Sequence, residues 1–294
     1  MVWISRRQAL VGSMLMASAT TVLPGGAAAK AVEDVSQQLA DLESRHGGRL
    51  GVAILEMSSG ARSGHRENER FLMCSTFKAL LAAHILARVD RQEDRLDRRI
   101  VISEADLVPW APITETRIGG DGMTIAELCE AVVTMSDNVA ANLLLAASGG
   151  PAALTGYARS LGDEVTRLDR IEPALNEHDG PDDARDTTSP AAMLETLRTL
   201  IFGEALSRAS RDQLSAWLIT NKTGDERLRA GMPAEWMVGD KTGTNRSGNA
   251  NDIGFGWPND RAPFIVTSYC DMPNASADER NSVIAEVGRI AAGG

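Results

Sequence analysis

A chain of 294 residues with 43% hydrophobic and 24% charged residues is long enough to bury a sizeable core, as one large domain or two interleaved subdomains. The formal net charge is −10, and it becomes −12 if the first 29 residues, which contain Arg6 and Arg7, are removed. Such acidity argues against nucleic acid or an anionic membrane surface as a partner, although a small anionic substrate can still be held by local cations.

The first 29 residues have the pattern of an export signal. Arg6 and Arg7 precede a moderately apolar run at 11–23, and three alanines at 27–29 suit cleavage by a signal peptidase. Paired arginines before a modest apolar stretch are typical of twin-arginine export, and an ordinary Sec signal is the alternative. Either route predicts a periplasmic protein without a membrane anchor after cleavage, because no later run reaches the ~18 apolar residues that a span requires.

Cysteine and histidine usage gives no sign of a metal site. Cys74, Cys129 and Cys270 are widely spaced and form no CxxC pair, and their odd number leaves at least one free thiol. The patterns around Cys129 and Cys270 place both in the core. The four histidines are scattered, at positions 46, 65, 84 and 178, without metal-ligand spacing. We expect no metal and no cofactor.

The first third of the chain is predicted to contain a helix, a hairpin and a second, buried helix. Residues 32–45 have helical periodicity, and residues 50–56 and 61–66 form two strand patterns about a Ser-Ser-Gly turn. In residues 79–87 the apolar side chains recur at helical spacing without Gly or Pro, so this segment continues a buried helix that begins near residue 75.

Ser75 and Lys78 stand at the start of that helix, three residues apart, so their side chains share one face. Backbone N–H groups at a helix N-terminus stabilise developing negative charge, and a partly buried lysine can lose its proton and act as a base. An N-cap serine followed by a chance lysine has the same pattern. The interpretation as nucleophile and base therefore depends on the rest of the chain.

A long helical middle follows, introduced by a loop. Two prolines stiffen residues 107–112 around Trp110, which we interpret as a wall of a ligand cleft or as simple packing. Later helix starts are marked by capping boxes at 124–127, 210–213 and 276–279, and by an N-cap serine with proline at 189–190. A Gly-Gly-Pro run at 149–151 separates two helices.

The last third changes to strands at 237–241, 252–257 and 263–270, with a closing helix at 277–291. This order predicts an α/β (α+β) fold, in which an antiparallel sheet flanked by helices combines the first and last segments. The expected mature domain spans 30–294, with an α/β lobe at about 30–68 and 220–294, an all-helical lobe at about 69–219, and the active site at their seam.

Three further stretches carry polar groups that apolar packing does not explain. Ser136-Asp137-Asn138 lies between two helical patterns, where a hydroxyl can relay a proton and an amide can fix a carbonyl, although a plain helix end fits equally well. A long loop begins at Arg170 and continues through Asp186 to Thr188, and the pair Arg170 and Asp186 is suited to close its neck.

Within that loop, proline after Glu172 restricts the backbone, so that Glu172 and Asn176 are placed to hold a water with the carboxylate as general base. Lys241-Thr242-Gly243-Thr244 follows a short strand, where Gly243 permits close approach of a ligand and Lys241 supplies a cation for a substrate carboxylate. In this order and spacing the four stretches are no longer a chance combination.

The set resembles the class A serine β-lactamases, which carry SxxK, SDN and KTG motifs. The resemblance extends from about residue 35 to the C-terminus and includes EPALN, RDTTSP, NLLL and GDKTGT. It implies a β-lactamase/transpeptidase-like fold and a monomeric hydrolase that opens the ring of penicillin- and cephalosporin-type antibiotics, and so confers resistance.

The resemblance also implies roles for the residues. Ser75 would be acylated, with Lys78 as base, directly or with Glu172 acting through water, and with backbone N–H groups of Ser75 and Thr244 as oxyanion hole. Ser136 would pass a proton to the leaving nitrogen. Substrate would be held by Asn138, Lys241, Thr242, Gly243 and Thr244, with Trp110 and Arg229 beside it, and Glu172 and Asn176 would position the deacylating water.

Class A carbapenemases share the LVPW segment, RLRAGMPAEW with Arg229, and a cysteine at the position of Cys74. They pair that cysteine with one directly after KTGT, where this chain has Asn245. The disulfide cannot form between these positions, so Cys74 is predicted to be a buried free thiol. The resemblance therefore does not extend carbapenem hydrolysis to this chain.

Two other functions share part of the pattern. A cell-wall transpeptidase or carboxypeptidase shares SxxK and KTG, and a β-lactam sensor is acylated and stays so. Glu172 with Asn176 favours the hydrolase, because a receptor that must remain acylated has no use for a deacylation base.

Overall fold

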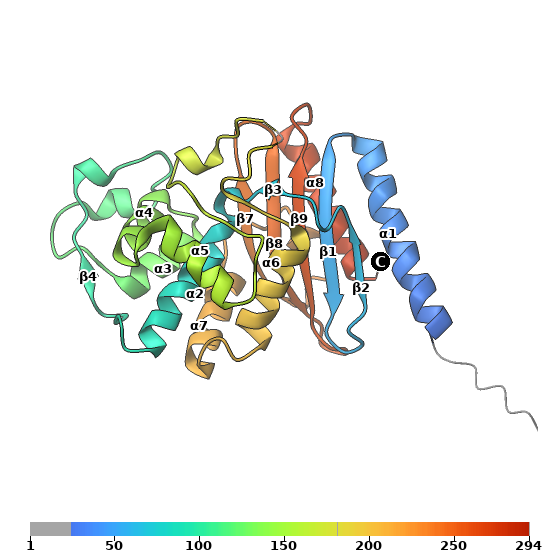
Figure 1. Ribbon diagram of the computed structural model, residues 1–294, viewed down its shortest axis with the longest axis horizontal. Coiled ribbons are helices and arrows are strands. Elements are labelled where there is room, and N and C mark those ends of the chain that lie inside the picture. The colour runs from blue at the N-terminus through green and yellow to red at the C-terminus, as the bar shows by residue number, and fades with distance from the viewer. Residues whose placement is uncertain (1–24, 181, 294) are drawn as a thin grey trace, which may run out of the picture.

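The computed structural model describes residues 25–180 and 182–293, in which a five-stranded antiparallel sheet has the order β2-β1-β9-β8-β7 (Figure 1). The strands are β1 (Arg49–Glu56), β2 (Arg62–His65), β7 (Met237–Thr244), β8 (Asn249–Trp257) and β9 (Phe264–Asp271). Because β1 pairs with β9, in a register that sets Leu50 opposite Cys270, the first and last segments share one sheet, as the sequence predicts.

Helices cover both faces of this sheet (Figure 1). The long N-terminal helix α1 (Gly25–His46) and the closing helix α8 (Ala277–Ala291) lie on one face, and α6 (Pro190–Leu197) lies on the other. Alternate residues of β1 serve the two faces: Val52 and Ile54 pack with the α1–α8 side, and Ala53 and Leu55 with the opposite side. This alternation is the period of two that a sheet buried on both faces requires.

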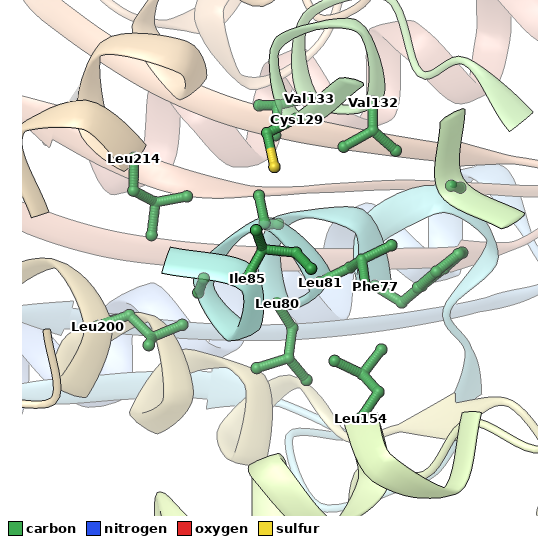
Figure 2. Packing of buried hydrophobic residues seen from close by; sticks show 14 of the residues in the cluster. Phe77, Leu80, Leu81, Ile85, Cys129, Val132, Val133, Leu154, Leu200 and Leu214 are labelled. Atoms are coloured by element: carbon green, nitrogen blue, oxygen red, sulfur yellow. The ribbon is translucent and has the colours of Figure 1, made fainter. Parts of the chain in front are cut away.

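A second body of helices surrounds α2 (Phe77–Asp90), in which every residue from Phe77 to Ala87 is buried. Figure 2 shows side chains of α2 enclosed by apolar residues from the neighbouring helices. Those helices are α3 (Ile125–Thr134), α4 (Asn138–Ala147), α5 (Gly150–Ser160) and α7 (Arg208–Ile219). The helix that follows Ser75 is therefore the central element of the largest apolar cluster.

Short elements connect these bodies. They are the strands β3 (Phe71–Leu72), β4 (Arg99–Ile100), β5 (Met123–Thr124) and β6 (Thr187–Thr188), and the single-turn segments η1 (Cys74–Thr76), η2 (Glu104–Asp106), η3 (Thr114–Arg117), η4 (Ala174–Asn176), η5 (Arg198–Phe202) and η6 (Leu228–Gly231). Pairing of β3 with β6 sets Leu72 opposite Thr187, which joins the approach to Ser75 to the end of the 170–186 loop.

Most helix-start predictions are confirmed, and one is wrong. Thr124 and Ser276 form complete capping boxes, and the Ser189 side chain accepts a hydrogen bond from the backbone of Ala192. The box predicted at 210–213 does not form, because α7 begins earlier in the chain, with Ser207 as its N-cap.

The hydroxyl of Ser210 is occupied elsewhere, since it donates to Asp90 Oδ1 over 2.7 Å. Asp90 also accepts from the Ser207 backbone N–H and hydroxyl, at 2.8 and 2.7 Å. A carboxylate at the end of α2, distant in sequence, therefore selects which serine begins α7.

One strand extends further than the sequence predicts, and part of another prediction lies outside the described residues. Lys241–Thr244 are the last four residues of β7 rather than a segment after it, because their backbone pairs with residues 250–253 of β8. Of the predicted export signal only residues 25–29 are described, as the start of α1. The predicted lobe boundaries stay a prediction; within the range assigned to the helical lobe, α6 packs on the sheet, where Thr267 donates to Pro190 O over 2.9 Å.

Within the described residues, no single helix is both long and apolar enough to cross a membrane. Helices α4 and α5 pass that test of length and hydropathy only as a pair, which is bent by 77°.

Leu81 lies on α2 with no exposed surface, at the centre of the cluster in Figure 2. We expect Leu81→Ala to lower the free energy of unfolding by about 2–5 kcal/mol, since it removes buried apolar atoms and leaves a cavity. Val101→Ala, at a side chain that is 62% exposed, is the matched control and should change stability little. Denaturant unfolding measures both; equal effects would contradict the central place of α2.

Candidate active site

Ser75 lies in the single turn η1, immediately before α2, between the buried residues Cys74 and Thr76. Cys74 has a φ of +45°, a conformation that costs a non-glycine residue free energy and needs support from its surroundings. The Thr76 hydroxyl gives that support by donating to Met73 O over 2.9 Å. The turn holds Ser75 partly exposed at the head of a helix that is otherwise buried.

Lys78 is fully buried and surrounded by oxygen acceptors from three segments. Its Nζ donates to Ser136 O at 2.8 Å and to Asn138 Oδ1 at 2.6 Å, and it lies 3.0 Å from Glu172 Oε1. Burial lowers the pKa of Lys78, and the neighbouring Glu172 carboxylate opposes that change. The Ser75 hydroxyl donates to the same Glu172 oxygen over 3.3 Å, so serine and lysine meet through the carboxylate.

The Ser136 hydroxyl stands between two buried ammonium groups. Its Oγ is 3.4 Å from Lys78 Nζ and 3.1 Å from Lys241 Nζ. Ser136 has a φ of +57°, and the next residue, Asp137, caps α4 and accepts hydrogen bonds from the backbone and hydroxyl of Thr114. The triplet is thus a helix end and restart, as one interpretation of the sequence has it, and the same turn points a hydroxyl between two cations.

Asn138 is engaged at both ends of its amide. Its Oδ1 accepts from Lys78, and its Nδ2 donates to Pro109 O over 2.8 Å. Its backbone N–H donates to Trp110 O over 2.9 Å, and the Trp110 indole donates to Met135 O over 3.0 Å. Trp110, at 62% exposed and with a φ of +66°, therefore stands in solvent beside the Ser136 turn, where a wall was predicted.

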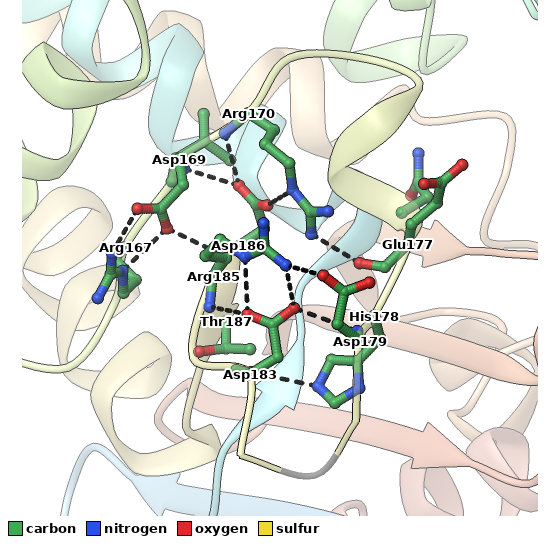
Figure 3. Close-up of polar contacts among 12 residues, drawn as sticks. Arg167, Asp169, Arg170, Glu177, His178, Asp179, Asp183, Arg185, Asp186 and Thr187 are labelled. Carbon is green, nitrogen blue, oxygen red and sulfur yellow. Dashed lines mark hydrogen bonds and ion pairs between the residues drawn. The ribbon is translucent and has the colours of Figure 1, made fainter.

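The neck of the 170–186 loop is closed as predicted (Figure 3). Arg170 Nε donates to Asp186 Oδ2 over 2.6 Å, and Asp186 Oδ1 accepts the backbone N–H groups of Asp169 and Arg170 at 2.7 and 3.0 Å. Arg170 also reaches into the loop and donates to Glu177 O over 2.6 Å. Figure 3 also shows Arg185 pairing with Asp183 and with Asp179. Ionic contacts thus hold a long loop that has little regular structure.

Glu172 is held by its backbone and by its side chain. Asn142 on α4 binds the backbone twice: its Oδ1 accepts Glu172 N–H and its Nδ2 donates to Glu172 O, both over 2.9 Å. Asn176 Nδ2 donates to Glu172 Oε2 over 2.6 Å, which leaves Oε1 to Ser75 and Lys78. Asn176 Oδ1 is buried without a partner among the described residues. Sequence reasoning gave Asn142 no role, because an asparagine inside an apolar helix pattern gives no signal of what it binds.

The last residues of β7 form the opposite wall. Lys241 is fully buried, and burial, with the charge of Lys78, lowers its pKa to about 7. A Cβ at Gly243 would lie 2.6 Å from Met73 O and 3.1 Å from Ser75 N. The glycine is therefore required so that the strand can pack on the turn that carries Ser75. Close approach of a ligand at Gly243, which the sequence suggested, stays a prediction. Thr242 Oγ1 lies 2.5 Å from Thr223 Oγ1.

The arginine beside Thr244 is Arg227, and the choice of Arg229 from the sequence is wrong in position. Arg229 is paired with the buried Asp240 carboxylate and also donates to Ile219 O over 3.2 Å. Arg227 is 8% exposed and donates to Thr244 Oγ1 at 2.7 Å and to Gly243 O at 3.0 Å. Two arginines two residues apart precede and enter the short turn η6, and only the path of that turn decides which one reaches β7.

The three cysteines are free and buried, which confirms the prediction for Cys74. Within residues 25–180 and 182–293, no group of three His, Cys, Asp or Glu side chains is arranged to hold a metal ion. The site consists of hydroxyl, ammonium, carboxylate and amide groups. They comprise a partly exposed serine hydroxyl, two buried lysines, and a carboxylate with one oxygen that faces the serine and one that accepts from an amide.

Comparisons with known proteins show which family this chain belongs to. The family model described as the beta-lactamase enzyme family matches residues 34–293. Beta-lactamase L2 of Stenotrophomonas maltophilia is 46% identical, with 98% of each chain covered. The carbapenem-hydrolyzing beta-lactamase KPC of Klebsiella oxytoca is 45% identical, over 95% of this chain and 94% of the relative. A solved structure of an ancestral (GNCA) class A beta-lactamase has 63% identity and a TM-score of 0.85, over 87% of this chain and 98% of that one.

Burial raises the pKa of the Cys74 thiol, the cysteine next to Ser75, and of Cys129 and Cys270. Since the thiolate is the reactive form, we expect none of the three to react with a chromogenic aryl disulfide at neutral pH in the folded protein, and all three to react in denaturant. Absorbance of the released thiolate measures both. Rapid reaction of one thiol in the folded state, lost in Cys74→Ser, would contradict the burial of Cys74.

Proposed function

Because the chain belongs to the beta-lactamase enzyme family and is a class A β-lactamase, a hydrolase of β-lactam antibiotics, we propose that it acts through an acyl-enzyme on Ser75. The Ser75 oxygen attacks the lactam carbonyl carbon, the ring C–N bond breaks, and water later cleaves the new ester. Overall one water is consumed and one ring is opened.

Two groups are placed to remove the Ser75 proton. Glu172 Oε1 accepts from the hydroxyl at 3.3 Å, and Lys78 Nζ lies 3.0 Å from the same oxygen. The lowered pKa of Lys78 favours a neutral amine that can act as base, while the carboxylate can act directly or through a water. Both routes stay open. Backbone N–H groups of Ser75 and Thr244 are proposed to stabilise the oxyanion, at roughly 3–4 kcal/mol per donor.

Ser136 is proposed to carry the proton to the leaving nitrogen. Its hydroxyl lies between Lys78 and Lys241, at 3.4 and 3.1 Å. Two nearby ammonium groups favour loss of the hydroxyl proton when the nitrogen needs it, and either cation can return a proton to Ser136.

The end of β7 is proposed to bind the substrate carboxylate. Lys241 supplies the charge, with the hydroxyls of Thr242 and Thr244 beside it. Since Thr244 Oγ1 already accepts a hydrogen bond from Arg227, its own hydrogen is free to point to the anion. Asn138 and Trp110 are proposed to contact the rest of the substrate. Asn138 Nδ2 donates one hydrogen to Pro109 O, and its second hydrogen is proposed to bind a substrate carbonyl.

Deacylation is assigned to Glu172 and Asn176, and their geometry carries the proposal. The Ser75 hydroxyl meets one oxygen of the carboxylate and the Asn176 amide meets the other. The unpartnered Asn176 Oδ1 adds a free acceptor to the same place among the described residues. A water held there lies beside both the ester and its base, an arrangement that turnover requires and a transpeptidase or a sensor does not.

We further propose that the enzyme works in the periplasm as a monomer, exported by the twin-arginine route through residues 1–29. Penicillins and cephalosporins are the proposed substrates. One relative is a carbapenem-hydrolyzing enzyme, but this chain has Asn245, which cannot form a disulfide with Cys74. We therefore do not include carbapenems among the proposed substrates. Steady-state hydrolysis of a penicillin, a cephalosporin and a carbapenem side by side tests this range.

Glu172→Gln keeps the shape of the side chain and removes the base. We expect Ser75 still to be acylated while turnover falls by about a hundredfold or more, so that a penicillin adduct accumulates and is seen by intact-mass measurement. Ser75→Ala is the control and should form no adduct. Retained activity without an adduct in Glu172→Gln would remove the role given to Glu172.

The lowered pKa of Lys241, about 7, predicts a pH dependence of substrate capture. The ammonium form is present below this pKa and is lost as pH rises through it, so attraction for an anionic substrate weakens above neutrality. We expect kcat/KM, which reports groups in the free enzyme, to fall between about pH 6 and pH 8. Lys241→Arg stays protonated and should shift this fall upward; an identical profile would show that another group titrates.

A further inference from the structure

Asn245, the residue directly after β7, uses all of its side-chain hydrogen-bonding capacity. Its Oδ1 accepts the backbone N–H groups of Ser247 and Asn249, at 3.0 and 2.9 Å. Its Nδ2 donates to Asn249 Oδ1 at 2.8 Å and to Asn176 O at 3.0 Å. Two accepted and two donated bonds fill the amide, and they fix which end carries the oxygen.

Three of these bonds are local to the β7–β8 turn, and the fourth leaves it. The bond to Asn176 O is the one hydrogen bond, among the described residues, between the segment 237–257 and the segment 170–186. On its other side the loop is held by Arg170, which donates to the carbonyl of the next residue, Glu177. The adjacent carbonyls of Asn176 and Glu177 therefore accept hydrogen bonds from two different parts of the fold, from Asn245 after β7 and from Arg170 at the neck of the loop.

We propose that Asn245 is a positioning residue for deacylation, which holds Asn176 and through it Glu172 in the place where water is activated. This proposal rests on the function given above to Glu172 and Asn176. Among the described residues, the Asn245 side chain makes no hydrogen bond to Ser75 or to the Glu172 carboxylate. It acts through the backbone of Asn176, whose side chain binds Glu172 Oε2.

The two oxygens of Glu172 have different partners, and this difference assigns the Asn245 bond to the Oε2 side. Ser75 and Lys78 contact Oε1, and Asn142 on α4 holds the backbone of Glu172. Asn176 contacts Oε2 from the loop, and the Asn245 bond supports only that side. Loss of the bond therefore loosens the water-holding oxygen while the groups that form the acyl-enzyme keep their places.

Two substitutions remove the bond in different ways. Asn245→Asp keeps the oxygen that accepts from Ser247 and Asn249, and it sets a carboxylate oxygen against the carbonyl of Asn176. Asn245→Ala removes the bond without adding charge. Asn249→Ala is the matched control, because it deletes a partner inside the turn and leaves the bond to Asn176 in place.

We expect both Asn245 variants to lose a penicillin adduct about three to ten times more slowly than wild type, measured by intact mass after the substrate is exhausted or removed. KM and kcat should fall together, which leaves kcat/KM unchanged, since that ratio reports acylation. Asn249→Ala should retain the wild-type rate and ratio. A thermal unfolding scan of each variant confirms that it is folded at the assay temperature.

The remaining outcomes overturn one proposal or both. Adduct loss at the wild-type rate in folded Asn245→Asp and Asn245→Ala, or an equal defect in Asn249→Ala, shows that Asn245 serves only the turn. A parallel fall of kcat and kcat/KM shows an effect on acylation, which overturns the assignment of Asn245 to deacylation. If Glu172→Gln forms no adduct in the same assay, the function proposed for Glu172 fails first, and the assignment of Asn245 fails with it.

Discussion

The site is built around a lysine and a glutamate buried together. The side chains of Lys78 and Glu172 are 0% exposed, and their charged atoms lie 3.0 Å apart. Taking either charge out of water alone would be costly, so the surroundings must satisfy both. Ser136 and Asn138 complete the shell of the ammonium, and Asn176 and Ser75 that of the carboxylate. The groups to which we assign catalytic roles are thus also the groups that offset the cost of burying this pair.

Lys78 lies on helix α2 and Glu172 lies in the 170–186 loop. Several residues in the segments around this pair have a strained backbone. Cys74, Trp110, Ser136 and Asp186 all have positive φ values, and all four lie in or next to the site or its loop. Such conformations persist only where the surrounding structure determines them strongly. Here these conformations are stabilised by packing of helix α2, by the hydrogen bonds of Asp137 with Thr114, and by the Arg170–Asp186 ion pair.

Sequence patterns predicted most elements because local signals were strong. The helix at residues 277–291 and the capping boxes at Thr124 and Ser276 needed only side chains within a few residues of each other. The predicted start of α7 was wrong because Asp90, more than a hundred residues away in the chain, accepts hydrogen bonds from Ser207 and Ser210. The choice of Arg229 was wrong for a similar reason. Arg227 and Arg229 cannot be told apart by sequence pattern, and the buried Asp240 carboxylate forms an ion pair with Arg229.

The sequence by itself determined the family of this enzyme and indicated the chemistry that we propose for it, since Ser75, Lys78, Glu172 and Lys241 are recognisable by type, order and spacing. Their meeting was decided only by the tertiary structure, because it depends on segments far apart in the chain sharing one buried volume. The tertiary structure alone shows that Gly243 packs on the turn that carries Ser75 and that Asn142 binds the backbone of Glu172. It also shows that Asn245 donates a hydrogen bond to Asn176 O. The spacing of motifs in the sequence can identify candidate reacting groups, but hydrogen bonds between distant segments determine the positions of their atoms.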